Sequence, residues 1–317
     1  MKKFLIYGAG ALGQALGCML AQAANHVDFL LRSRYIETIA AKGLKVDGVL
    51  GEFSAPFENI RLLDTLGDAA GTYDYVLLTT KAYDTEAAAK EIAVLGEKFH
   101  HVVSMQNGCG NIELLETVCG RDKCLGGRVI TGFEITSPGR VHVSVTADAI
   151  HVGASRSGVI PQAAEKLANL ITTAGHPCRA VEDIHSSLFA KLLYNCALNP
   201  LGAILGVHYG ALSEHDETRR IMNRIIDETF SVIGAMGGKT PWQSSLEYME
   251  VFYDTLIPAT YNHRASMLQD LEQGKPTEVE SLVGYVSKMG KKYGIKTANC
   301  DMAADLIRFK QAESIKK

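Results

Sequence analysis

The sequence predicts an α/β fold, with a doubly wound, mostly parallel sheet in the N-terminal half and a smaller all-α domain after it. In the first half, short β-like runs alternate with helical runs, which is the pattern of βαβ units and a parallel sheet. From about residue 184, long amphipathic helical runs replace this alternation. The chain of 317 residues is long enough for two domains. We therefore expect domains at 1–182 and 183–317.

Each expected strand of the first half is followed by an expected helix. The pairs are "KFLIYG" and "LGQALGCMLAQAA", "HVDFLLRS" and "YIETIAAKG", "YDYVLLTTKA" and "DTEAAAKEIAVLG", and "HHVVSMQNG" and "NIELLETVCG". A β-rich stretch with a turn at "SPGRVHVS" comes next, so we expect the sheet to end in antiparallel strands. A helix near 161–174 and a short strand near "PCRAVED" complete this half.

The second half is predicted to be helical throughout. Its amphipathic runs lie at 186–204, 213–236, 242–254, 260–272 and 277–293. No flexible linker separates the two halves. We expect a tight boundary near 180–184 and a site in the cleft between the domains.

Composition and charge exclude several classes of protein. A formal charge of −3 gives no reason to expect a nucleic-acid partner. No run approaches the roughly 18 apolar residues of a membrane span, and "FLIY" is too short for the core of a signal peptide. The seven cysteines are scattered without a CxxC pair, as expected for reduced thiols. These features predict a cytoplasmic, metal-free protein, and they are compatible with a homodimer.

The N-terminal "IYGAGALG" carries a GxGxxG pattern between a strand and a helix, which is the context of a Rossmann-type dinucleotide site. Gly8 permits the tight turn, Gly10 lets the backbone approach a pyrophosphate, and Gly13 lets helix and strand pack closely. The backbone of Ala11 and Leu12 belongs to the same helix start, where N–H groups favour an anion. The alternative is a glycine-rich turn without a ligand.

The end of the second expected strand indicates which nucleotide binds. Asp28 has the spacing of the acid that contacts a ribose, but we interpret it as a solvated residue at the start of the strand. Where the strand ends, "RSR" offers Arg32 and no carboxylate. A guanidinium there complements a 2′-phosphate, so the sequence favours NADPH over NADH. The alternative is a surface arginine.

Lys81 and Asn107 follow the third and fourth expected strands, in "TTKAYDT" and "SMQNGCGN". Open α/β sheets bind ligands at the carboxyl ends of their strands. Either residue alone is explained equally well by the chemistry of a turn. Together they favour placement of the cofactor's nicotinamide.

Lys191, Asn195 and Asn199 recur every four residues in the apolar stretch "KLLYNCALNPL". A step of four residues drifts only about 40° around a helix, so the three side chains form one polar stripe. A buried ammonium or amide requires partners, which favours a stripe that lines a binding site. Lys191 alone is also compatible with a side chain that snorkels to the surface.

Ser266 and Glu278 stand in "ASMLQDLEQGKPTEVESLVGYV", with Ser266 expected near a helix interior and Glu278 at a helix start. Each has a simple structural alternative. Ser266 would hydrogen-bond to its own helix, and Glu278 would interact with the helix dipole.

With these motifs the whole chain resembles the ketopantoate reductase (2-dehydropantoate 2-reductase) family. The resemblance is carried by "GAGALG", "TTKAYDT", "QNG", "KLLYNCALNPL" and "SMLQD…GKPTEVESLVGYV". It implies that Lys191 is the general acid, that Asn195 and Asn199 bind the substrate's hydroxyl and keto oxygens, that Ser266 binds its carboxylate, and that Glu278 completes the polar cluster.

The resemblance also implies roles for the cofactor residues. Lys81 and Asn107 would lie at the nicotinamide and the substrate, with Glu278 beside them, and Arg32 would contact the 2′-phosphate. The implied reaction is reduction of 2-dehydropantoate to pantoate with NADPH, for pantothenate and coenzyme A biosynthesis. Residues 1–182 would then form the NADP-binding domain and 183–317 the substrate and catalytic domain.

Two positions depart from the family's pattern. His263 stands where the family commonly has a substrate-binding asparagine, and it is either a substitute ligand or a capping residue. Val283 replaces the asparagine before Gly284. These departures leave two alternatives open: an NADPH-dependent reductase of another 2-oxo acid, and a non-catalytic NADPH-binding regulator. The joint presence of the lysine, amide, serine and glutamate side chains argues against the regulator.

Overall fold

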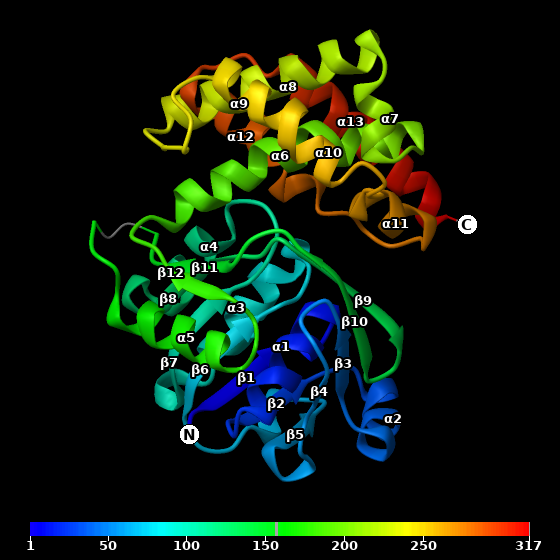
Figure 1. Cartoon of the computed structure of the whole chain (residues 1–317). Coiled ribbons are helices and arrows are strands. Elements are labelled where there is room, and N and C mark those ends of the chain that lie inside the picture. The colour runs from blue at the N-terminus through cyan, green and yellow to red at the C-terminus, as the bar shows by residue number, and fades with distance from the viewer. Residues whose placement is uncertain (156–157, 317) are drawn as a thin grey trace. The chain divides into compact units, whose positions relative to one another are not determined.

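The computed structural model describes residues 1–155 and 158–316, apart from the side chain of Arg34, and it contains two compact units. Unit 1 comprises Met1–Gln106 and Asn111–Ile184, and unit 2 comprises Asn107–Gly110 and His185–Lys317. The segment Asn107–Gly110 therefore packs with the helical unit, although the chain on both sides of it belongs to unit 1 (Figure 1).

Unit 1 is built on an eight-stranded sheet with the order β12-β11-β8-β7-β6-β1-β2-β5. All neighbouring strands are parallel except β8 and β11. The predicted doubly wound, mostly parallel fold is confirmed. The strands are β1 (Lys3–Tyr7), β2 (His26–Leu30), β5 (Ile60–Leu63), β6 (Tyr73–Leu78), β7 (Phe99–Ser104), β8 (Cys124–Arg128), β11 (Ile150–Gly153) and β12 (Cys178–Ala180).

Helices cover both faces of this sheet because its strands are apolar on both faces. Phe4 and Ile6 of β1 belong to one hydrophobic cluster, whereas Leu5 and Tyr7 belong to another. The first cluster includes residues of α1 and α5, and the second includes residues of α3 and α4. The helices of unit 1 are α1 (Ala11–Gln22), α2 (Ser33–Lys42), α3 (Thr85–Ala93), α4 (Asn111–Cys119) and α5 (Gln162–Thr173).

The predicted antiparallel end of the sheet needs a correction. The turn at "SPGRVHVS" does join two antiparallel strands, β9 (Thr131–Ser137) and β10 (Arg140–Thr146). They lie in a separate four-stranded sheet with β3 (Lys45–Gly48) and β4 (Phe53–Ser54). β3, β4 and β5 were not predicted, because strands of two to four residues are too short to give a periodic signal.

Unit 2 is helical, as predicted, but its last two predicted runs start later than expected and three of its described helices were not predicted. The run at 260–272 is helical only from Ser266, and the run at 277–293 begins with a 3₁₀ turn, Val279–Ser281. The helices are α6 (Ile184–Leu205), α7 (Tyr209–Ser213), α8 (Asp216–Ala235), α9 (Ser245–Val251), α10 (Ile257–Ala259), α11 (Ser266–Glu272), α12 (Val283–Tyr293) and α13 (Ala298–Ile315), of which α7, α10 and α13 were not predicted.

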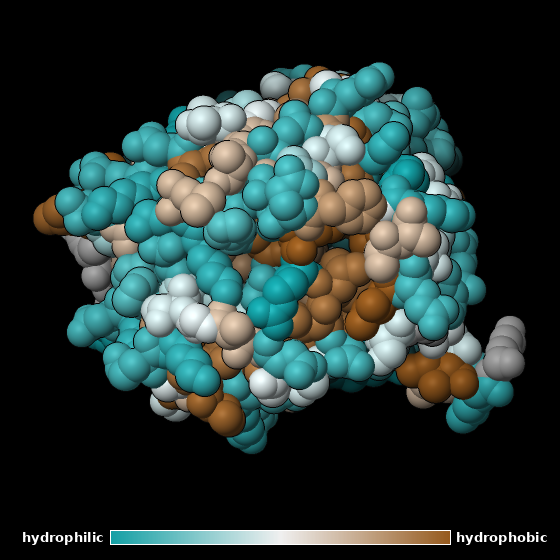
Figure 2. Space-filling model, turned by 90° about the horizontal axis from the view of Figure 1, so that it is seen from below, coloured by the Kyte–Doolittle hydropathy of each residue, from teal (hydrophilic) through white to brown (hydrophobic). Residues whose placement is uncertain are grey.

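Helix α6 is long and apolar enough to cross a membrane by length and composition alone. The expectation that no run approaches this length therefore needs a correction. In the structure, 72% of its most apolar window is buried inside the protein. Figure 2 shows one face of the molecule, mostly hydrophilic, with hydrophobic residues gathered in a hollow near its centre. The apolar composition of α6 is thus explained by its place in the core of unit 2.

A cluster of charged and titratable side chains around the buried residues Arg128 and His151 lies at the edge of the main sheet in unit 1. His151 of β11 is 7% exposed and contacts Arg128 of β8 and Arg179 of β12. Asp148 forms an ion pair with Arg128 at 2.7 Å. Burial, followed by the charges of the two arginines, lowers the pKa of His151 to about 4.

This cluster predicts a pH-dependent stability. In the unfolded chain the pKa of His151 returns to about 6.5, so between pH 6.5 and 4 the unfolded state binds more protons. The contribution of neutral His151 to the free energy of unfolding is fully present above pH 6.5, and it is lost as the pH falls towards 4. In urea unfolding at several pH values, a His151→Gln variant should lose less of its free energy of unfolding across this window than the parent. Equal slopes in the two proteins would contradict the assignment.

Candidate active site

The glycine turn before α1 has the geometry that a dinucleotide requires. Gly8 has a φ of +94°, and a Cβ on it would overlap Thr80. A Cβ on Gly13 would lie 2.5 Å from Thr79 Oγ1, so this glycine permits the close packing of α1 on the sheet. No atom lies within 4 Å of a Cβ built on Gly10. The backbone at Gly10 therefore faces open space that a ligand can enter.

The start of α1 offers N–H groups towards such a ligand. Its N-cap residue Gly10 has no side chain to cap the helix. Within the described part of the chain, no acceptor is found for the N–H groups of Ala11, Leu12 and Gly13. N–H groups and the positive end of a helix dipole bind phosphate oxygens. These residues fit the pyrophosphate of a nicotinamide dinucleotide.

Arg32 lies at the carboxyl end of β2, as the sequence indicated. It is the N-cap residue of α2 and is exposed. Asp84 lies within its electrostatic range: burial raises the pKa of Asp84, and the charge of Arg32 opposes this effect. An exposed guanidinium at this edge is available to an anion.

The interpretation of Asp28 as a solvated residue at a strand start is wrong. Asp28 is the middle residue of β2 and is 4% exposed. Its carboxylate accepts a hydrogen bond of 2.6 Å from the hydroxyl of Tyr73, and Lys3 Nζ lies 3.5 Å away. Tyr73 is the first residue of β6, so the carboxylate interacts at the amino ends of the strands. The Asp28 carboxylate is bound to Tyr73 and Lys3 at this end and does not face the ligand edge of the sheet.

Lys81 lies beyond the carboxyl end of β6, before a 3₁₀ turn at Ala82–Asp84. Its carbonyl accepts a hydrogen bond of 3.2 Å from Gln106 Nε2. Gln106 is 6% exposed and also donates to Thr85 Oγ1 at 2.8 Å. This glutamine fixes the loop that carries Lys81. This role of Gln106 was not predicted from the sequence, although the residue stands beside Asn107 in the "QNG" motif.

The polar stripe of α6 forms as predicted. Asn195 and Asn199 are 6% and 4% exposed, and Lys191 is partly buried. Asn199 Nδ2 donates to Asn195 Oδ1 at 3.3 Å. Pro200 follows inside the helix and has no N–H to donate to the carbonyl of residue 196.

Asn107 connects the lysine with the glutamate. Its Oδ1 accepts a hydrogen bond from Lys191 Nζ, and its Nδ2 donates to Glu278 Oε2 at 3.3 Å. The loop reaches this position because Gly108 has a φ of +81° and packs against the Ser281 backbone, where a Cβ would overlap. The Cys109 N–H donates to the Ser281 carbonyl at 2.9 Å. The three side chains Lys191, Asn107 and Glu278 form what we call the lysine relay.

Glu278 is 7% exposed and precedes the 3₁₀ turn Val279–Ser281. It is not in the first turn of α12, so the helix-dipole interpretation does not describe it. Its carbonyl accepts from the Ser281 N–H at 3.1 Å and from Ser281 Oγ at 3.0 Å. The turn therefore holds the backbone of Glu278 while its carboxylate contacts Asn107.

Ser266 joins the asparagines, whereas His263 does not. Ser266 is the first residue of α11, and not near a helix interior as expected, and its Oγ donates to Asn199 Oδ1 at 3.2 Å. The ring of His263 packs on the ring of Tyr209, with 5.2 Å between ring centroids. Its side chain has no hydrogen bond to any residue in the described part of the chain.

Unit 2 thus contains two hydrogen-bonded groups, each of which includes side chains of α6. One is the lysine relay at Lys191, and the other consists of the amides of Asn195 and Asn199 with Ser266. The first combines a proton donor with a carboxylate, and the second offers neutral donors and acceptors. Such a set is chemically able to polarise and protonate a carbonyl oxygen.

Comparison with known proteins identifies the family. The family model "Ketopantoate reductase PanE/ApbA" matches residues 4–157, and its C-terminal counterpart matches residues 183–311. The chain belongs to the ketopantoate reductase family. The chain is 36% identical over 315 residues to the 2-dehydropantoate 2-reductase of Aquifex aeolicus, covering 99% of this chain and 98% of that protein. It is 32% identical to that of Archaeoglobus fulgidus, covering 97% of each.

Solved structures share the fold over nearly the whole chain. A 2-dehydropantoate 2-reductase of Geobacter metallireducens is 28% identical, with a TM-score of 0.86 over 97% of this chain and 99% of that one. A D-mandelate dehydrogenase solved with NADH and anilino(oxo)acetate is 26% identical, with a TM-score of 0.85 over 98% and 99%. Membership in this family makes the protein an oxidoreductase that acts on a CH–OH group.

Proposed function

We propose that this protein reduces 2-dehydropantoate to pantoate with NADPH, as a cytoplasmic enzyme of pantothenate and coenzyme A biosynthesis. The observation that carries the proposal is the lysine relay, which places an ammonium, an amide and a carboxylate in one hydrogen-bonded row within unit 2. The relatives named 2-dehydropantoate 2-reductase, which match along the whole chain, support this substrate.

Unit 1 is proposed to hold the cofactor. The N–H groups of Ala11, Leu12 and Gly13 would bind its pyrophosphate, and Arg32 would bind its 2′-phosphate. Lys81 would lie near its nicotinamide. The reduced nicotinamide, when bound, supplies the hydride that the ketone carbon accepts.

Lys191 is proposed as the general acid. Negative charge grows on the keto oxygen as the carbonyl is reduced, and Lys191 Nζ would donate a proton to that oxygen. The positive charge of the ammonium also stabilises the developing alkoxide before the proton moves. Asn107 orients the ammonium through its Oδ1, and Glu278 in turn orients Asn107.

The amide group of the site is proposed to bind the substrate. Asn195 and Asn199 would hold its hydroxyl and keto oxygens, and Ser266 its carboxylate. The ring of His263 on Tyr209 presents an aromatic surface instead of an amide. That observation favours, as a second candidate, a 2-oxo acid with a bulkier apolar group, in line with the D-mandelate dehydrogenase of the same fold.

A panel of 2-oxo acids tests the proposal. NADPH oxidation by the purified protein should have its highest kcat/KM with 2-dehydropantoate, compared with 2-oxoisovalerate and phenylglyoxylate. A preference for phenylglyoxylate would replace the first candidate with the second. No oxidation with any 2-oxo acid, although NADPH binds, would contradict both.

The cofactor preference gives a separate prediction. Arg32→Ala should weaken NADPH binding by about 10- to 10²-fold, because a charge-assisted hydrogen bond to phosphate is lost. NADH binding should change less than twofold, since NADH has no 2′-phosphate. Fluorescence titration of the two cofactors measures both constants. Arg121→Ala, which changes another exposed arginine of unit 1, is the matched control. Equal losses for NADPH and NADH would contradict the assignment.

A further inference from the structure

Helix α13 contacts the turn of Glu278 on the side that precedes the glutamate. Gln311 Oε1 accepts a hydrogen bond of 2.7 Å from the Thr277 N–H and one of 2.9 Å from Thr277 Oγ1. Thr277 is 4% exposed, so this contact is within the protein. Gln311 of α13 therefore holds the backbone of Thr277, the residue directly before Glu278.

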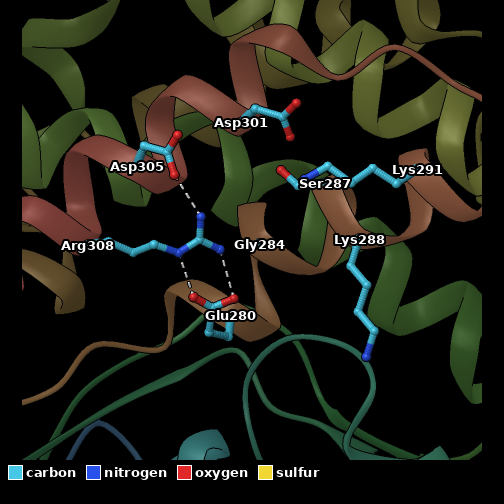
Figure 3. A pocket seen from close by; sticks show the side chains of 8 residues that line it. All are labelled: Glu280, Gly284, Ser287, Lys288, Lys291, Asp301, Asp305 and Arg308. Atoms are coloured by element: carbon cyan, nitrogen blue, oxygen red, sulfur yellow. Dashed lines mark hydrogen bonds and ion pairs between the residues drawn. The ribbon is translucent and has the colours of Figure 1, made fainter.

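The same helix contacts the turn on the side that follows the glutamate. Arg308 forms a bidentate ion pair with Glu280, from Nε to Oε1 at 2.8 Å and from Nη2 to Oε2 at 2.9 Å. Asp305 accepts from Nη1 of the same guanidinium at 2.8 Å. Figure 3 shows Arg308 extended from α13, with Asp305 above it and Glu280 below it. The two parallel hydrogen bonds orient the guanidinium and the carboxylate of Glu280 relative to each other, because the two groups match in one plane.

Arg308 and Gln311 are three residues apart and lie on one face of α13. Their partners Thr277 and Glu280 are also three residues apart, and Glu278 lies between them. A helix is rigid over a single turn. The Gln311–Thr277 and Arg308–Glu280 contacts therefore attach the turn of Glu278 to α13 at two points whose separation is fixed. Between those points lies Glu278, whose carboxylate accepts the hydrogen bond from Asn107.

We propose that Arg308 and Gln311 are positioning residues for the reductase reaction, holding the Glu278 carboxylate at Asn107 and hence orienting Lys191. The inference rests on the proposed function, because it assigns α13 a role in that same site. It also gives the C-terminal helix a task beyond packing. Neither Arg308 nor Gln311 touches the reacting atoms; both act through the turn at 278.

A purely structural role is the alternative that the experiment must exclude. Arg308 and Glu280 are exposed, with 43% and 67% of their side chains accessible, and an exposed ion pair contributes little to stability. Loss of stability alone would lower the melting temperature and the fraction of active protein. It would not change how the variant responds to a second change at Glu278. The interaction between the two changes is therefore the decisive measurement.

The test uses Arg308→Met and Gln311→Leu, singly and together, in the full-length protein. With 2-dehydropantoate and NADPH at saturation, kcat should fall roughly tenfold in the double variant, because misplacing an orienting group lowers the rate of the chemical step. The KM for NADPH should stay within twofold. Gln311→Glu keeps an acceptor oxygen for Thr277 and should restore kcat to near the parent value.

In a Glu278→Gln background, the same double change should lower kcat by less than twofold, because its effect passes through the missing carboxylate. A full tenfold loss in that background would overturn the proposal, as would an unchanged kcat in the parent background. If the double variant does not fold, Gln311→Leu alone is compared in the two backgrounds.

Arg220→Met is the matched control. Arg220 forms an exposed ion pair with Glu217 on α8, at 2.9 Å, and should leave kcat unchanged. The activity of the parent protein distinguishes a failure of the proposed function from a failure of the positioning role. If the parent reduces no 2-oxo acid, the proposed function has failed; if the parent is active and the α13 variants match it, only the positioning role has failed.

Discussion

Replacing Lys191 with alanine is expected to lower kcat by about 10²-fold or more while leaving the binding of NADPH intact. The residues proposed to bind the pyrophosphate and the 2′-phosphate belong to unit 1, whereas Lys191 belongs to unit 2. Removal of the ammonium therefore takes away the proton donor without touching the glycine turn. The loss corresponds to about 2.7 kcal/mol of transition-state stabilisation.

Two further variants separate the functions of the lysine. Lys191→Met keeps the length of the aliphatic stem and should be as inactive as the alanine variant if charge and proton matter. Lys191→Arg keeps a positive charge but holds its proton too tightly for an efficient general acid, so it should recover only part of the activity. Lys239→Ala, at an exposed position of unit 2, is the control and should retain the parent's kcat. Unchanged turnover in Lys191→Ala would remove the proposed role.

The glycine motif could be predicted because its signal is local. Gly8, Gly10 and Gly13 act within one turn, and the strand before them and the helix after them are both evident from periodicity. The repeat of Lys191, Asn195 and Asn199 is equally local, since one helix determines which side chains share a face. Such features need no knowledge of distant contacts.

Features that depend on distant contacts were missed or misinterpreted. The burial of Asp28 depends on Tyr73, which lies 45 residues away in the sequence. The place of Asn107 in unit 2 depends on a contact with Glu278, which lies 171 residues away. Neither relation is contained in a window of sequence. The first led to a wrong interpretation of Asp28, and the second was implied only by the family resemblance.

Helix α13 was missed for a different reason. Apolar side chains lie on more than one of its faces: Cys300 and Ile307 are buried, whereas Met302 and Phe309 are 50% and 64% exposed. An apolar stripe is what indicates an amphipathic helix, and here the stripe is blurred. The residues that contact the Glu278 turn are polar: Arg308 lies between Ile307 and Phe309, and Gln311 follows two residues after Phe309. Sequence periodicity therefore gave neither the helix nor its contacts.

Replacing Asn107 with leucine is expected to lower kcat by about 10- to 10²-fold. Leucine has the same branching at Cγ and the same number of side-chain heavy atoms as asparagine, but it removes the acceptor for Lys191 and the donor to Glu278 together. Loss of a buried hydrogen-bond partner in such a group costs about 1–3 kcal/mol, which accounts for a change of this size in the rate. Steady-state kinetics with 2-dehydropantoate measures the loss.

Asn107→Asp distinguishes a bridge from a simple acceptor. Aspartate keeps an oxygen for the ammonium of Lys191, but it has no N–H for Glu278 and places a second carboxylate where the amide nitrogen lies 3.3 Å from Oε2. If Asn107 only accepts from Lys191, the aspartate variant should approach the parent's kcat. If both hydrogen bonds of the relay are required, Asn107→Leu and Asn107→Asp should both have a low kcat. Combining either variant with Glu278→Gln should then lower kcat by less than the product of the two single effects. We expect the second result, because the amide is the one side chain of this size that accepts from an ammonium and donates to a carboxylate at the same time.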